Sequence, residues 1–158
     1  MADQDIRDAV QLSVGWLRIL ITGSRDWRDR KAIFDGIFGY LNEHWAYQIS
    51  GPHEVTIMQG GQVSEDKITH EKWGADYFAD QVAWAVGFKR DLYPADWKRY
   101  GKRAGRIRNQ EMVDTHKINK IYACLAFPLG RSPGTRDCMR RADAVGIPVI
   151  NLGDREVR

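Results

Sequence analysis

Residues 17–26 read Leu-Arg-Ile-Leu-Ile-Thr-Gly-Ser-Arg-Asp. An apolar, β-branched run that stops at Thr-Gly-Ser and leads into a helical pattern predicts a strand, a tight turn and a helix. In an open parallel sheet such a turn lies at the carboxyl end of its strand, where ligands bind. We therefore expect Gly23 to admit a ligand close to the backbone. Thr22, Ser24 and Arg25 are expected to line the same site, with Ser24 and the helix N–H groups receiving a phosphate.

Strands and helices alternate along the rest of the chain. Short apolar runs predict further strands at residues 54–59, 88–92, 121–127 and 147–152. Apolar residues at helical spacing predict helices at residues 29–45, 71–87, 107–117 and 136–145. Alternation of this kind predicts an α/β fold, a three-layer, doubly wound and mostly parallel sheet with helices on both faces.

The domain organisation predicted from the pattern is simple. Residues 1–16 are expected to form an N-terminal arm or a short helix, and residues 17–158 a single domain. The polar, mixed-charge segment 62–70 has no clear period and predicts an exposed loop.

Composition excludes several classes of protein. The 158 residues carry a formal net charge of only +3, so the overall field does not require a polyanionic partner. Cys124 and Cys138 have no metal-ligand spacing, which favours reduced thiols, no metal site and a cytoplasmic location. The sequence shows neither the apolar core of a secretory signal nor a membrane-spanning run.

Two more predicted strands end in glycine turns. Gly60 and Gly61 follow the strand at 54–59, and a longer turn follows the strand at 121–127. The glycines of that longer turn permit a curl of inward-pointing N–H groups that suits an anion. Each turn alone is also ordinary loop geometry, but all three share one edge of a parallel sheet. The longer turn supplies five candidate ligand-binding residues: Gly130, Arg131, Ser132, Gly134 and Thr135.

Six basic residues and no acidic residue occur between Lys98 and Arg108. Such a block is often a solvated surface, but it can also clamp phosphate or border a nucleic-acid site. Arg108 and Asn109 are expected at the start of a helix, where a guanidinium can reach a phosphate at the ligand edge. Trp97 and Tyr100 either pack the neighbouring loop or stack on a base.

The acidic candidates are less specific. Asp76 lies near the start of its predicted helix, where its charge either interacts favourably with the helix dipole or contributes to the ligand site at the strand ends. Asp26 is a second acid that could contribute to that site. Asp137 and Glu111 are possible acid–base groups without an evident partner. The four histidines are scattered and suggest no catalytic arrangement.

Together these motifs resemble the YspA-like family of the SLOG superfamily, which groups DNA-processing Smf/DprA proteins with Lonely Guy phosphoribohydrolases. The resemblance covers residues 17–152 and rests on six motifs in order: residues 18–27, Gly60-Gly61, 74–76, 94–97, 104–109 with Met112, and 130–135. It implies a Rossmann-like sheet that binds a nucleotide-derived ligand at its strand ends, in proteins of phages and bacteria.

Two departures from that family matter. Residues 62–73 intervene between the Gly-Gly and Gly-Ala-Asp motifs, which usually lie close together. The phosphoribohydrolases carry an Arg at the position of Arg108 and a catalytic Glu in Gly-Thr-x-x-Glu, where this chain has Cys138. A thiol does not replace a carboxylate at an oxocarbenium-like transition state, and Asp137 lies one position too early.

Three functions therefore remain open. The first is a sensor or scavenger that binds a nucleotide or an NAD- or ADP-ribose-derived molecule and requires no cofactor. The second is a phosphoribohydrolase-like enzyme that cleaves the N-glycosidic bond of nucleoside monophosphates, with Arg108 and Asp137 as candidate catalytic residues. The third is single-stranded nucleic-acid binding. The resemblance also implies a homo-oligomer, a dimer or tetramer, for which Trp45, Trp73 and Trp84 are either interface anchors or core residues.

Overall fold

A five-stranded parallel sheet forms the centre of the molecule. The computed structural model describes residues 2–5 and 14–154. The sheet order is β5-β2-β1-β6-β7, so the strand order reverses at β1, between β2 and β6. This is the topological switch point at which open α/β sheets bind ligands. The strands are β1 (Leu17–Gly23), β2 (Val55–Gln59), β5 (Lys89–Leu92), β6 (Ile121–Phe127) and β7 (Val149–Asn151).

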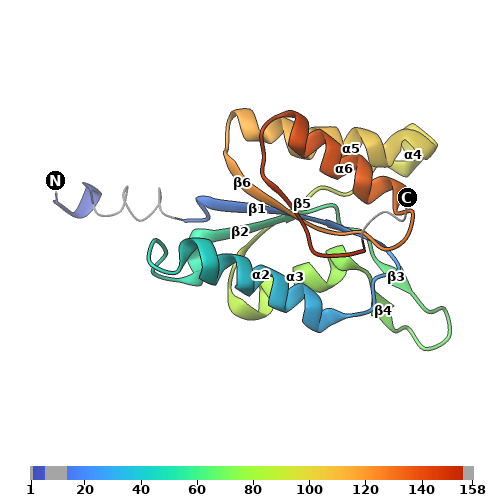
Figure 1. Ribbon diagram of the computed structural model, residues 1–158, viewed down its shortest axis with the longest axis horizontal. Coiled ribbons are helices and arrows are strands. Elements are labelled where there is room, and N and C mark those ends of the chain that lie inside the picture. The colour runs from blue at the N-terminus through green and yellow to red at the C-terminus, as the bar shows by residue number, and fades with distance from the viewer. Residues whose placement is uncertain (1, 6–13, 155–158) are drawn as a thin grey trace.

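Helices cover both faces of this sheet, which confirms the predicted three-layer architecture (Figure 1). The helices α2 (Arg30–Trp45) and α3 (Ala75–Val86) lie on one face. The other face carries α5 (Ala104–Asp114) and α6 (Pro133–Ala144), with the short α4 (Trp97–Tyr100) at one end of this layer. Because α5 and α6 follow β5 and β6, their N-terminal ends lie near the carboxyl ends of the strands.

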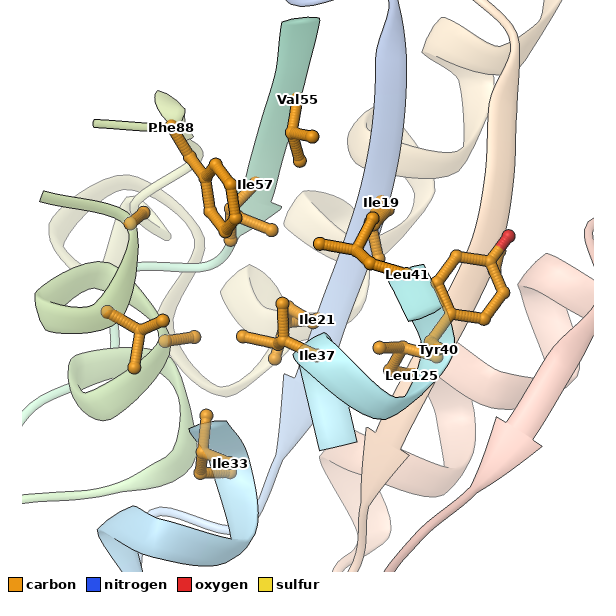
Figure 2. Close-up of a cluster of buried hydrophobic side chains, with 14 of the residues drawn as sticks. Ile19, Ile21, Ile33, Ile37, Tyr40, Leu41, Val55, Ile57, Phe88 and Leu125 are labelled. Carbon is orange, nitrogen blue, oxygen red and sulfur yellow. The ribbon is translucent and has the colours of Figure 1, made fainter. Parts of the chain in front are cut away.

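The larger apolar core lies between the sheet and the α2–α3 layer. Figure 2 shows Ile19 and Ile21 of β1 among side chains of α2, and all of these are buried. A smaller cluster that includes Leu20, Met58 and Met112 packs the other face. Full burial on both faces explains why β1 and β6 have nearly continuous apolar sequences.

Several predicted elements differ in detail. Residues 62–70 are not simply a loop, because β3 (Ser64–Glu65) pairs antiparallel with β4 (Lys72–Trp73) in a small hairpin. The helix predicted from residue 71 therefore begins only at Ala75. The helix predicted at 29–45 is confirmed as α2, capped by the Asp29 side chain at the Ala32 N–H group, but it begins six residues after Ser24, so its N–H groups are not adjacent to the Ser24 turn as expected.

Helix α5 also begins earlier than predicted, at Ala104, so Arg108 lies one turn inside it. The prediction for residues 1–16 falls in large part on residues 1 and 6–13, which lie outside the described part of the chain. Trp45 and Trp73 pack against the core, whereas Trp84 is 74% exposed. Across residues 2–5 and 14–154, no helix has the length and apolar character needed to cross a bilayer.

Candidate functional site

A crevice of about 300 Å³ opens at the carboxyl ends of β1, β2 and β6. It lies at the switch point of the sheet and brings together turns that are more than 100 residues apart in the sequence. Twelve residues expected at a ligand site line it: Thr22, Gly23, Ser24, Arg25, Gly60, Asp76, Trp97, Arg108, Asn109, Ser132, Gly134 and Thr135.

Three other expected residues lie outside the crevice lining. Gly61 donates its N–H group to the Gln59 side chain and faces Pro94. Gly130 and Arg131 line a neighbouring groove instead. The convergence of the three glycine turns is therefore a feature of the structure, although not every glycine in them faces the crevice.

The turn after β1 is held by contacts within the protein. A Cβ atom at Gly23 would lie 2.3 Å from the Ala75 Cβ, so glycine is needed for α3 to approach β1. The Ser24 N–H group donates to the Phe127 carbonyl, and the Ser24 carbonyl accepts from the Ala75 N–H group. The Ser24 hydroxyl accepts from the Asp26 N–H group and keeps its own proton for a further acceptor.

Arg108 is 9% exposed, and its guanidinium is held in place by main-chain oxygens. Nη1 donates to the carbonyls of Gly60 and Tyr93, and Nε donates to the Asn109 side chain. Within the described residues no hydrogen bond engages Nη2. The close approach requires glycine at position 60, where a Cβ would lie 2.0 Å from Nη1. A fixed cation thus lines the crevice with donor capacity to spare.

Asp76 is the buried carboxylate of the crevice, at 6% exposed. Burial raises the pKa of Asp76 to about 6, against the opposing effects of the Arg108 charge and of main-chain hydrogen bonds from Gln62 and Gly60. The Gln62 N–H group lies 3.1 Å from Oδ2. This carboxylate therefore changes its charge close to neutral pH, as an acid–base group requires.

The N-terminus of α6 forms part of the wall of the crevice. Its second and third residues, Gly134 and Thr135, line the cavity, and their N–H groups make no hydrogen bond within the described residues. Ser132 is less available than expected, because its hydroxyl both donates to and accepts from the Leu129 main chain. The free N–H groups and the helix dipole favour an anion at this wall.

Asn109, on α5, connects α5 to the N-terminal part of α6. It is 3% exposed, and its Nδ2 donates to the Gly134 carbonyl at 3.1 Å and to Asp137 at 3.0 Å. Its side-chain oxygen accepts from Arg108. Asn109 therefore positions both Arg108 and the α6 N-terminus through bonds within the protein.

Asp137 does not line the crevice but the neighbouring groove. Burial alone would raise the pKa of Asp137, but hydrogen bonds from Arg141 and Asn109 outweigh it and lower the pKa. The Arg141 Nε atom lies 2.9 Å from Oδ2. An ionised, ion-paired carboxylate is poorly suited to proton transfer. Cys138 has an exposed fraction of 0% and also lies outside the crevice lining.

Some residues of this region were not singled out from the sequence. Gln62 and Gly105 line the crevice, and Arg136 holds the loop before α6 by donating to the Gly130 and Arg131 carbonyls. The arginine carries no local signal for such a role, because it looks like any polar residue of an amphipathic helix. The described residues contain no group of three or more His, Cys, Asp or Glu side chains able to hold a metal ion.

Comparison with known proteins identifies a phage relative. No protein-family model matches the chain. The chain is 43% identical over 143 residues to the Gene 61 protein of Mycobacterium phage D29, an alignment that spans 87% of this chain and 98% of the relative. Identity at this level over nearly the whole length means that the chain belongs to the family of the mycobacteriophage D29 Gene 61 protein.

Proposed function

We propose that the protein binds a nucleotide, or a phosphate ester derived from one, in the crevice at the carboxyl ends of β1, β2 and β6. The observation that carries this proposal is the meeting of Arg108 with the uncapped N-terminus of α6 in one crevice. Fixed N–H donors and a guanidinium together are complementary to a phosphate group. Trp97, which is 45% exposed, offers a ring on which a base can stack.

The size of the crevice and the strength of such contacts fit a small ligand. About 300 Å³ is at the lower end of the range of small-molecule sites. Charge-assisted hydrogen bonds contribute about 1.5–3 kcal/mol each. Several of them, with one stacked base, suffice for micromolar affinity, about −8 kcal/mol. A sensor or scavenger of nucleotides requires no more than this.

Isothermal titration calorimetry tests the proposal with a panel of mononucleotides, cyclic nucleotides, NAD and ADP-ribose. We expect at least one to bind with a micromolar dissociation constant and Arg108→Gln to weaken it at least tenfold, about 1.4 kcal/mol. Arg103→Gln is the matched control, because Arg103 is exposed and lines neither cavity. Thr135→Val removes one crevice hydroxyl without removing a charge and is expected to weaken binding too. Silence across the whole panel would refute the proposal.

A second candidate function is hydrolysis of the N-glycosidic bond, and the state of Asp76 favours it. A carboxylate with a pKa of about 6 beside Arg108 can accept a proton from water as the water attacks the ribose carbon and the base departs. Release of free base from nucleoside monophosphates, measured by chromatography, tests this. Asp76→Asn is expected to abolish release while Asp137→Asn retains it. Release no faster than in buffer would exclude the enzyme.

A further inference from the structure

A second hollow adjoins the crevice. It is a groove of about 1260 Å³ lined in part by residues of α5 and α6, the two helices that lie together on one face of the sheet (Figure 1). The two hollows are continuous, since they share Arg25, Trp97, Gly105, Pro133 and Gly134 in their linings. A molecule seated in the crevice can therefore extend into the groove past the Trp97 ring.

The lining of this groove is strongly basic. The whole chain has nearly balanced charge, with 24 Lys and Arg against 21 Asp and Glu. The groove has seven basic side chains against two carboxylates, Asp137 and Asp154. The basic set comes from three separate stretches of the chain, residue 25, residues 102–106 and residues 131–141: Arg25, Lys102, Arg106, Arg131, Arg136, Arg140 and Arg141.

Two of these cations have structural partners. Arg136 donates to main-chain carbonyls of the loop before α6, and Arg141 pairs with Asp137. Within the described residues, the side chains of the other five make no hydrogen bond and no ion pair. Like charges held together in one groove repel each other, so their placement favours a polyanionic occupant. Asp137 pairs with Arg141 and also interacts with the Arg140 charge, and Asp154 is the other carboxylate of the lining, so two carboxylates compensate seven cations only in part.

We propose that the natural ligand carries further phosphate groups beyond the one bound in the crevice, and that these lie in the groove between Arg106 of α5 and Arg140 of α6. The proposal rests on the proposed function and adds the class of ligand: a nucleoside polyphosphate or a phosphate-linked chain of nucleotides. The shared chemistry is a nucleotide unit that occupies the crevice and a phosphate chain that leaves it beside Trp97.

The test is calorimetry on the full chain with each nucleoside monophosphate, its triphosphate, a 5′-phosphorylated tetranucleotide and inorganic triphosphate. The triphosphate, the tetranucleotide or both are expected to bind at least tenfold more tightly than the monophosphate. A gain in affinity for the triphosphate alone identifies the ligand as a nucleoside polyphosphate. A gain for the tetranucleotide alone identifies it as a phosphate-linked chain of nucleotides. Inorganic triphosphate should bind more weakly than either, because it cannot fill the crevice.

The groove variant is Arg106→Gln with Arg140→Gln. It should remove most of the gain and leave monophosphate binding within about twofold. The matched control is Lys67→Gln with Lys117→Gln, which loses the same charge from exposed positions outside both hollows and should keep the gain. The affinity for the tetranucleotide should also fall with salt, by about 0.7 log unit per log unit of salt for each phosphate contacted.

The outcomes separate this proposal from the one on which it rests. Equal affinity for the monophosphate and both longer ligands would overturn the polyphosphate assignment while nucleotide binding stands. A gain that survives the groove variant would also overturn it, as would inorganic triphosphate binding as tightly as the nucleotides. Failure of every mononucleotide and every longer ligand to bind would instead refute nucleotide binding itself.

Discussion

Two buried carboxylates near opposite ends of the sheet show how differently its two edges are built. Glu54 precedes β2 at the amino edge, and Asp76 lies at the carboxyl edge; they are 8% and 6% exposed. Glu54 accepts hydrogen bonds from the Ser50 N–H and hydroxyl groups, from Gly51 and from the Trp16 indole. These bonds, led by that of the Ser50 N–H group, lower the pKa of Glu54 to about 2.

Asp76 has fewer donors, and burial raises its pKa to about 6. Desolvation and hydrogen-bond donors compete in setting the pKa of each carboxylate: the donors outweigh desolvation at Glu54, whereas the deeper burial of the Asp76 carboxylate outweighs its donors. At the amino edge the chain supplies enough hydrogen-bond donors to stabilise the ionised Glu54 carboxylate. At the carboxyl edge, N–H groups of α6 and the Arg108 Nη2 make no hydrogen bond within the described residues, which leaves donors for the proposed ligand.

The largest expected effect concerns Asp76. Because its pKa is higher in the folded than in the unfolded chain, its contribution to stability declines as pH rises between about 4 and about 6. A shift from 3.8 to about 6 corresponds to about 3 kcal/mol. The stability of Asp76→Asn relative to wild type should therefore increase by up to about this amount between pH 4 and pH 8, as measured by urea denaturation. An unchanged difference would contradict the assigned pKa.

Gly60→Ala tests the carboxyl edge of the sheet, where Gly60 packs against Arg108. The new Cβ must displace the Arg108 guanidinium and break its bonds to the Gly60 and Tyr93 carbonyls. We expect a loss of about 2 kcal/mol in the free energy of unfolding. Nucleotide affinity should also fall at least tenfold in calorimetry. Wild-type affinity in this variant would mean that Arg108 does not face the ligand.

Glu54→Gln should show the opposite pH behaviour to Asp76→Asn. The stabilisation from Glu54 is fully present above about pH 4.5 and is lost as pH falls toward about 2. The variant should melt several degrees lower than wild type at pH 7, and the difference should shrink on acidification. Nucleotide binding should be unaffected, because Glu54 does not line the crevice. A melting difference that persists at pH 2 would show that packing, not charge, is responsible.

The smallest expected effect belongs to Gly39→Ala, a matched glycine substitution away from both edges. Gly39 lies within α2, and a Cβ there would meet no atom within 4 Å. Alanine should stabilise the helix by about 0.5–1 kcal/mol. The midpoint of thermal unfolding should rise by about 1–4 °C, with unchanged ligand affinity. If Gly39→Ala were destabilising although its Cβ meets no atom, the loss of stability in Gly60→Ala could not be assigned to the contact with Arg108 alone.

Much of the fold was predictable because its signals are local. The apolar run of β6 and the left-handed Gly87 that ends α3 can be read from neighbouring residues. The hairpin at residues 64–73 could not, because each strand has only two residues and is held by distant contacts such as that of the Ser64 hydroxyl with the Arg25 carbonyl. The position of Arg108 at the strand-end crevice was predictable, but the main-chain carbonyls that hold its guanidinium were not.

The linear pattern of residues is enough to specify the alternation of strands and helices, and hence a parallel sheet with glycine turns along one edge. Hydrophobic periodicity and turn chemistry operate over a few residues, so they survive in the linear chain. Three other features become visible only in the folded chain: the desolvation of Asp76, the position of Asp137 outside the crevice, and the arginines from separate segments that share one groove. Desolvation and charge interactions depend on distances through space, which are set only when β1, β2 and β6 lie side by side.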